Sequence, residues 1–158
     1  MDLWRLSGAL HAEKFDGGGG LVQDGRWHSA GRPITYTSTH PSLCLLEKRV
    51  HLEGNDPIPT AEMLVRYDVP EGLAMEGITL EDLPDSWTDD ESSTQRIGDE
   101  WLARTHETGW TPLMMVPSAV IAAPASTDRN VLINHNHPDT ASITIVSIEP
   151  LRYDPRLF

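Results

Sequence analysis

The chain has 158 residues, a length expected of one domain with one substantial hydrophobic core. Its 12 Lys and Arg residues against 24 Asp and Glu residues give a formal net charge of −12, which argues against direct binding to nucleic acid or to an anionic membrane. A single cysteine, Cys44, excludes an internal disulfide and fits a reducing compartment, where we expect it to pack a helix. Because the sequence shows neither a secretory signal nor an apolar stretch of about 18 residues, we expect a soluble cytoplasmic protein.

In the first half of the chain, strands are predicted at 3–6 and 33–38, and a longer one at 61–70, where apolar residues alternate with polar ones. A helix is predicted at about 40–53, with Pro41 in its first turn. The run of four glycines at 17–20 matches no phosphate-binding motif, because neither a dinucleotide-binding fingerprint nor a following Lys-Ser/Thr accompanies it. We therefore expect a flexible loop there.

The second half begins with a loop at 82–93 and a helix at about 93–104, and three β-rich runs follow at 113–123, 130–134 and 141–153. Acidic residues concentrate in this part of the chain. Between Glu76 and Glu100, nine carboxylates accompany the single base Arg96, so this segment alone supplies −8 of the net charge. Such a segment is usually a solvated face, and the alternative is a contact surface for a basic partner protein. Extended segments at both ends and helices in the middle predict one α+β domain over 1–158.

One residue of the predicted helix at 40–53 breaks its pattern. At 100° per residue, Glu47 lies about 40° from Leu43, inside the arc that Leu46 and Val50 share with it. Lys48 falls outside that arc. Glu47 therefore either marks the rim of the apolar stripe and reaches water, or points into a cleft.

Four other segments have both a chemical and an ordinary interpretation. Segment 24–33 holds Arg26 and Trp27, which can grip a phosphate and stack on a ring, but which also pack together on ordinary surfaces. Arg5 lies between apolar neighbours in a strand, so it points outward or meets an anion. Ser118 has no nucleophile-elbow motif around it, which argues against a serine hydrolase. The histidines of "NHNHPD" at 134–139 form a weak zinc pattern without HExxH or Cys ligands, and a polar turn between strands suffices; we expect no metal.

In chain order, "WR", "GRWHSAGRPITYT", "LCLLEKRVHL", "GDEWL", "VPSAVI", "NVLINHNHPD" and "LRYDPRLF" resemble the RES domain family over nearly the whole chain. The family is named after an Arg, a Glu and a Ser, and its members are toxins of bacterial toxin–antitoxin pairs. The resemblance implies a single ADP-ribosyltransferase-like domain with a mixed, mostly antiparallel β core and flanking helices. Two positions depart from the family pattern, since His28 and His135 stand where Asn and Pro are common.

Carried over by position, the family's core residues fall on Arg5, Tyr36, Glu47 and Ser118, and its GRW arginine on Arg26. The resemblance implies that NAD is the substrate. Glu47 would then stabilise the positive charge that develops on the ribose as nicotinamide leaves. Arg5, or as second choice Arg26, would pair with the pyrophosphate.

The remaining implied contacts come from Tyr36, which would stack on nicotinamide or close the site, and from Ser118, which would hydrogen-bond the ribose or the nicotinamide amide. Trp27 adds a ring to the proposed NAD-binding set. The attacking group stays open: water gives a glycohydrolase, inorganic phosphate a phosphorylase, and a protein side chain an ADP-ribosyltransferase. We favour NAD degradation, since a domain of this size has little surface to spare for recognising a protein substrate.

Two alternatives belong to other classes. A non-catalytic binding protein would lack Arg5, Glu47 or Ser118, and all three are present. A metal enzyme built on His135 and His137 would bind zinc and respond to chelators. The resemblance also implies a cognate antitoxin with an Xre-like helix-turn-helix domain that covers the active-site cleft, which the acidic face at 76–100 could contact.

Overall fold

The computed structural model describes residues 1–52, 61–154 and 156. It contains a seven-stranded sheet and three α-helices in the described part of the chain, together with short 3₁₀ turns. The strands are β1 (Asp2–Gly8), β2 (Ile34–Ser38), β3 (Glu62–Asp68), β4 (Met75–Gly77), β5 (Leu113–Pro117), β6 (Arg129–Asn134) and β7 (Thr144–Pro150). The helices are α1 (Gly18–Val22), α2 (Pro41–Arg49) and α3 (Glu91–Leu102).

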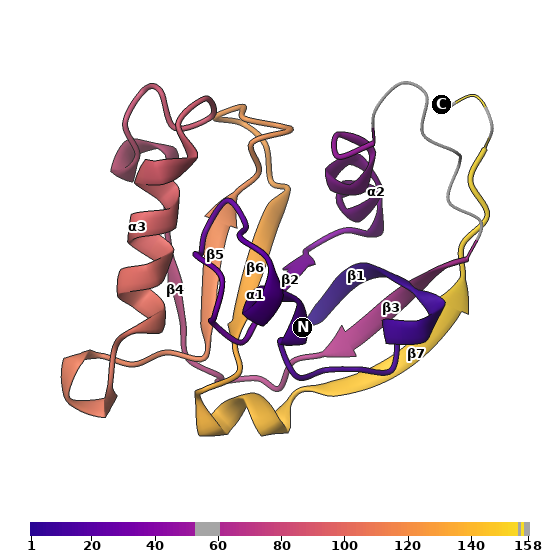
Figure 1. Cartoon of the computed structure of the whole chain (residues 1–158), viewed down its shortest axis with the longest axis horizontal. Coiled ribbons are helices and arrows are strands. Elements are labelled where there is room, and N and C mark those ends of the chain that lie inside the picture. Colours follow the sequence, from indigo (N-terminus) through magenta and orange to yellow (C-terminus); the bar gives the residue numbers. More distant parts are fainter. Residues whose placement is uncertain (53–60, 155, 157–158) are drawn as a thin grey trace.

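The sheet has the order β4-β5-β6-β2-β1-β3-β7 and is antiparallel except for the β4–β5 pair. Its middle joint is weak, because β1 and β2 are registered only at Trp4 and Ser38, whereas β1 pairs with β3 along seven residues. The two halves therefore diverge: β5 and β6 run nearly upright in Figure 1, while β3 and β7 run across it. Helix α2 lies beside this joint, where the Cys44 thiol donates to the carbonyl of Trp4.

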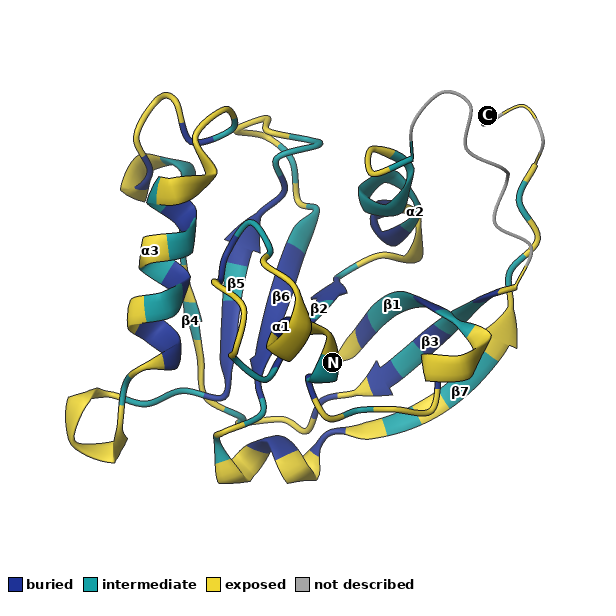
Figure 2. Ribbon diagram, viewed as in Figure 1, coloured by how far each residue is buried: buried dark blue, intermediate teal, exposed yellow. Residues whose placement is uncertain are grey.

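Two groups of buried side chains hold the fold together. One joins both halves of the sheet through Leu3, Val65 and Tyr67 on one side and Leu113, Val131 and Ile133 on the other. The second seats α3 and the loop before it on β5, β6 and β2, and it contains three tryptophans, Trp27, Trp87 and Trp101. Figure 2 shows the buried residues gathered along β5, β6 and the inner side of α3.

The ends of α2 and α3 follow from their sequences. Pro41 opens α2, where its missing N–H costs nothing. Asp90 caps α3 by accepting the N–H of Ser92. Midway along α3, Gly98 lies against the loop before β2, and a Cβ there would come within 1.8 Å of the Trp27 carbonyl oxygen. Only glycine allows this approach of helix to loop.

The structure confirms the α+β class, the mixed and mostly antiparallel sheet, and all the predicted strands and helices in outline. The helix predicted at 40–53 ends at Arg49, and residue 53 lies outside the described residues. The run predicted at 113–123 is extended only to Pro117, because a turn follows at Ser118. Helix α3 begins at Glu91, within the segment predicted as a loop. Strand β4 was not predicted, since three residues give no readable alternation.

The prediction of a flexible loop at 17–20 was wrong. Gly18–Val22 form the short helix α1, which packs against β2. Gly20 is buried, its carbonyl accepts the N–H groups of Gly31 and Arg32, and a Cβ on it would meet the Arg32 carbonyl oxygen at 2.4 Å. Glycine is therefore present because two backbone segments lie in contact, and not because the segment needs to move.

Candidate active site

Glu47 lies in the last turn of α2, and its side chain is half-buried and turned toward the ends of two strands. One carboxylate oxygen, Oε1, accepts hydrogen bonds from Ser118 Oγ at 2.8 Å and from Asn130 Nδ2 at 2.5 Å. The other oxygen, Oε2, accepts no hydrogen bond from the residues that the structure describes. Val50, which shares the arc in the helical projection, is exposed. Of the residues in this arc, Glu47 is therefore the one whose side chain is hydrogen-bonded to other segments of the protein.

Ser118 directly follows β5, and its side chain is buried. Its Oγ accepts the backbone N–H groups of Val120 and Ile121, at 3.1 and 3.3 Å, in the turn that ends the strand. These two contacts occupy the lone pairs of the hydroxyl, so that its proton is directed to Glu47. Of the four core residues expected from the sequence, Ser118 and Glu47 are in direct contact.

Asn130, at the start of β6, was not among the expected site residues. Its Oδ1 accepts the hydroxyl of Ser38 at 2.7 Å, while its Nδ2 donates to Glu47. In the sequence it stands next to "VLIN" and reads as an ordinary strand-start residue. Only the register that places Asn130 beside Ser38 and Val116 shows that it faces the carboxylate.

Tyr36, in the middle of β2, is anchored by its hydroxyl group. The backbone N–H of Trp27 donates to Oη at 3.0 Å, and Nδ1 of the buried His28 lies 2.8 Å from Oη. Oη and Nδ1 share one hydrogen bond, and the tautomer of His28 sets which of the two atoms donates it. Burial raises the pKa of Tyr36 and lowers the pKa of His28, so both side chains are neutral at pH 7.

Arg5, in β1, directs its guanidinium group to neutral oxygens. It donates to Ser7 Oγ at 2.9 Å and to the Lys14 carbonyl at 3.1 Å, with longer contacts to the His11 carbonyl and to Tyr67 Oη. Among the described residues it forms no ion pair. Arg5 shares no hydrogen-bonding partner with Glu47, but it follows Trp4, which is registered with Ser38 and bonded to α2.

Arg26 and Trp27 are used in packing. The Arg26 guanidinium donates to the carbonyl oxygens of Trp87 and Thr88, at 2.9 and 3.1 Å, and pairs with Glu91 at 3.2 Å. Trp27 is only 2% exposed and its ring lies 6.4 Å from that of Trp87. An indole enclosed in this way has no face left for a ligand, so the structure gives Trp27 a role in the core.

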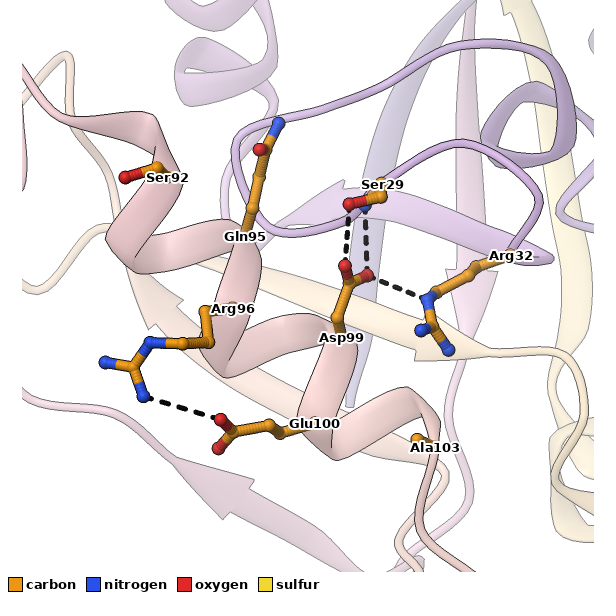
Figure 3. A pocket seen from close by; sticks show the side chains of 8 residues that line it. All are labelled: Ser29, Arg32, Ser92, Gln95, Arg96, Asp99, Glu100 and Ala103. Carbon is orange, nitrogen blue, oxygen red and sulfur yellow. Dashed lines mark hydrogen bonds and ion pairs between the residues drawn. The ribbon is translucent and has the colours of Figure 1, made fainter.

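Two shallow depressions lie away from Glu47. Figure 3 shows the first, of about 440 Å³, between α3 and the loop before β2. Asp99 lines this depression, where it accepts hydrogen bonds from the N–H and hydroxyl groups of Ser29 and pairs with Arg32 at 2.8 Å. Partial burial acts to raise the pKa of Asp99, but these hydrogen bonds and the Arg32 charge together hold it below its usual value. This arrangement fastens the loop to α3. The second depression, of about 370 Å³, is lined by Phe15, His135 and the turn after β6.

Comparison with known proteins places the chain in a family. The model of the RES domain matches residues 2–154. The chain belongs to the RES domain family. A protein of Pseudomonas putida named "Toxin Res" is 36% identical over 159 residues, covering all of both chains. The "Prs ADP-ribosylating toxin" of Sphingobium sp. is 30% identical, covering 98% of this chain and 94% of the relative.

The fold of this RES domain is similar to a chain in the crystal structure of the Mycobacterium tuberculosis MbcT–MbcA toxin–antitoxin complex. The TM-score is 0.69 at 18% sequence identity, and the match covers 95% of this chain and 83% of the other. At this sequence identity, the match shows a similar fold only.

The two histidines of the RES domain's "NHNHPD" segment serve separate structural contacts. His135 Nε2 lies 2.8 Å from Thr35 Oγ1, and the His135 ring packs edge-on to Phe15. His137 accepts the N–H of Asp139 at the start of the 3₁₀ helix Pro138–Ser142. Over residues 1–52, 61–154 and 156, no three His, Cys, Asp or Glu side chains gather as a metal site requires. In the same ranges no helix combines the length and apolar character needed to span a membrane.

Six of the nine acidic side chains at 76–100 form hydrogen bonds or ion pairs within the RES domain. Asp90 caps α3, Asp82 closes a turn with Thr79, and Asp99 holds Ser29 and Arg32. Ion pairs account for Glu76, Glu91 and Glu100, whose partners are Arg104, Arg26 and Arg96. The concentration of negative charge is therefore explained largely by internal capping and pairing. The proposal that this face contacts an antitoxin has no separate structural support.

Proposed function

We propose that this RES domain is the toxin of a bacterial toxin–antitoxin pair and that it cleaves the bond between nicotinamide and ribose in NAD. The family membership and the toxins among its relatives support the first part. One observation supports the second. The Glu47 carboxylate is held at Oε1 by Ser118, directly after β5, and by Asn130 of β6, and Oε2 accepts nothing from the described residues. A fixed carboxylate with one open oxygen suits a developing positive charge.

The reaction itself needs little from the protein beyond binding and electrostatics. As the glycosidic bond breaks, its electron pair goes to the nicotinamide nitrogen, which carried the positive charge in NAD. Nicotinamide therefore leaves as a neutral molecule and needs no proton. The positive charge passes to the anomeric carbon of the ribose, where the negative Glu47 carboxylate stabilises the oxocarbenium-like transition state.

Arg5 is the better candidate for the pyrophosphate. All its hydrogen bonds go to neutral oxygens, so its charge is not balanced by a carboxylate among the described residues. Arg26, in contrast, is held by two carbonyl groups and by Glu91. Tyr36 would offer NAD the face of its ring, because its hydroxyl is already bonded on both sides. We leave Trp27 out of the proposed NAD contacts, since it lies in the core.

The acceptor of the ribosyl group separates two versions of this function. Water or inorganic phosphate would give NAD degradation, which we favour for a domain of this size. The second version is protein ADP-ribosylation, and the name of the Sphingobium relative, which shares 30% identity across nearly the whole chain, favours it. In either version we propose that the protein acts in the cytoplasm and is restrained by a cognate antitoxin with an Xre-like helix-turn-helix domain.

The test is nicotinamide release from NAD by the purified protein, with and without inorganic phosphate, beside the Glu47→Gln variant. Replacing the charge by an amide should lower the rate by a factor of about 10² to 10³, the loss typical of one electrostatic contact to a transition state. Glu107→Gln makes the same chemical change at an exposed turn and should leave the rate unchanged. A Glu47→Gln protein with full activity would sink the assignment. Dependence on phosphate would separate phosphorolysis from hydrolysis.

A further inference from the structure

The side chain of Asn130 links Glu47 of α2 to Ser38 of β2. It is 9% exposed and lies on β6 between Ser38 of β2 and Val116 of β5. Its amide nitrogen donates to Glu47 Oε1, and its amide oxygen accepts the hydroxyl of Ser38. Each end of the amide therefore forms one hydrogen bond within the protein, and together these two bonds fix its orientation.

Glu47 determines the direction of the two hydrogen bonds that connect it through Asn130 to Ser38. A carboxylate oxygen can only accept, so Asn130 must present its NH₂ group to Oε1 and its carbonyl oxygen to Ser38. Ser118 reaches the same oxygen with its proton, because its lone pairs accept the N–H groups of Val120 and Ile121. Donors from the residue after β5 and from β6 thus converge on Oε1, and each donor is itself held by a further contact.

Such support matters because of where Glu47 stands. It lies in the last turn of a nine-residue helix, and its flexible side chain would otherwise reach solvent in many rotamers. Two donors on a single oxygen select one rotamer and leave Oε2 as the oxygen that meets the ligand. Placement matters for catalysis, since a shift of about 1 Å in a reacting group can cost on the order of 10²-fold in rate.

We propose that Asn130 is a positioning residue that acts through Glu47: it fixes the carboxylate so that Oε2 faces the ribose. Ser38 supports it by holding the amide in the required orientation. This inference rests on the proposed NAD chemistry. Asn130 is predicted to contribute to turnover and not to substrate binding, because its side chain is hydrogen-bonded to Glu47 and Ser38 and acts on the reaction through Glu47.

A double-mutant cycle tests this role. Nicotinamide release would be measured for the wild type, Asn130→Ala, Glu47→Gln and the double variant. Asn130→Ala should lower kcat by about 10- to 100-fold with KM changed less than about threefold. In the Glu47→Gln background, the same change should cost less than about threefold, because the group through which Asn130 acts is already impaired. Asn136→Ala, which removes an amide from the turn after β6, is the matched control.

The outcomes distinguish a failure of the proposed function from a failure of the role given to Asn130. A wild type that releases no nicotinamide would overturn the proposed NAD degradation, and a fully active Glu47→Gln protein would overturn the catalytic role of Glu47; either result would overturn this inference as well. If the wild type is active and Glu47→Gln impaired, an equal loss from Asn130→Ala in both backgrounds would overturn the inference alone, as would a full-rate Asn130→Ala protein. Should Asn130→Ala fail to fold, Ser38→Ala takes its place in the cycle. Ser38→Ala removes only the hydroxyl that holds Asn130 Oδ1. It should again lower kcat and leave KM unchanged when Glu47 is present, and have little effect in the Glu47→Gln protein.

Discussion

Replacing Tyr36 by Phe removes one oxygen atom and leaves two buried polar groups without their partner. The backbone N–H of Trp27 loses its acceptor, and Nδ1 of His28 loses its hydrogen-bonding partner. Trp27 and His28 are only 2% and 3% exposed, so water cannot replace either contact without rearrangement. At about 1 to 3 kcal/mol for each unpaired buried group, and allowing for some relaxation, the free energy of unfolding should fall by about 2 to 4 kcal/mol.

Thermal and urea unfolding measure this loss. For a domain of this size, each kcal/mol lowers the Tm by about 2 to 4 °C, so a decrease of about 4 to 16 °C is expected. Tyr67→Phe is the matched control, because Tyr67 is fully buried but its hydroxyl has only a 3.4 Å contact with Arg5. It should cost less than about 1 kcal/mol. Equal stability of Tyr36→Phe and wild type would refute the reasoning that the hydroxyl anchors this loop.

Three other changes have definite expected results. Arg5→Ala should weaken NAD binding as well as turnover, with a raised KM or a weaker Kd by calorimetry, since an unbalanced cation is removed; unchanged affinity would assign the pyrophosphate to another residue. Gly98→Ala should lower the free energy of unfolding by about 3 kcal/mol or more in urea, because its Cβ meets the Trp27 carbonyl, while Gly8→Ala, with open space around it, should be nearly neutral. Burial lowers the pKa of His135 to about 4 from the usual 6.5, so the unfolded chain binds a proton first as the pH falls, and stability should drop by a few kcal/mol between pH 6.5 and 4. The His135→Gln variant should show a smaller drop over the same range, and an equal drop would assign the effect to other groups.

The glycine-rich segment shows why one part of the fold escaped prediction. Four consecutive glycines have no side chains to give a pattern, and their composition favours a flexible chain. In the structure Gly17 precedes α1 and the other three glycines begin it, and the close contact of α1 with the segment before β2 depends on the missing Cβ atoms. The neighbouring "GRWHSAGRP" run gives no local sign of this contact, because its Arg32 carbonyl oxygen meets Gly20 only when both segments lie beside β2. That relation exists only in three dimensions.

Two arginines next to tryptophans illustrate the same limit in the site. Arg5 and Arg26 look alike in the sequence, since each adjoins a tryptophan near a predicted strand. The structure separates them through their partners: Arg26 is bonded to carbonyl groups and a carboxylate across the tryptophan-rich core, whereas Arg5 contacts neutral oxygens alone. Which charge remains to attract an anion depends on neighbours far away in the chain.

The sequence by itself determined the elements whose patterns are local. Alternation predicted β3, short strand-like runs predicted β1 and β2, and helical spacing predicted α2 and α3 in outline. The position of Glu47 within an apolar arc made it a candidate before any contact was known. Tertiary structure decided what surrounds that carboxylate. Ser118 and Asn130 are 71 and 83 residues from Glu47 along the chain, and the order and register of β2, β5 and β6 bring them within hydrogen-bonding distance. A single-residue shift in that register would turn Asn130 to the other face of the sheet, so its role depends on strand pairing that no local pattern encodes.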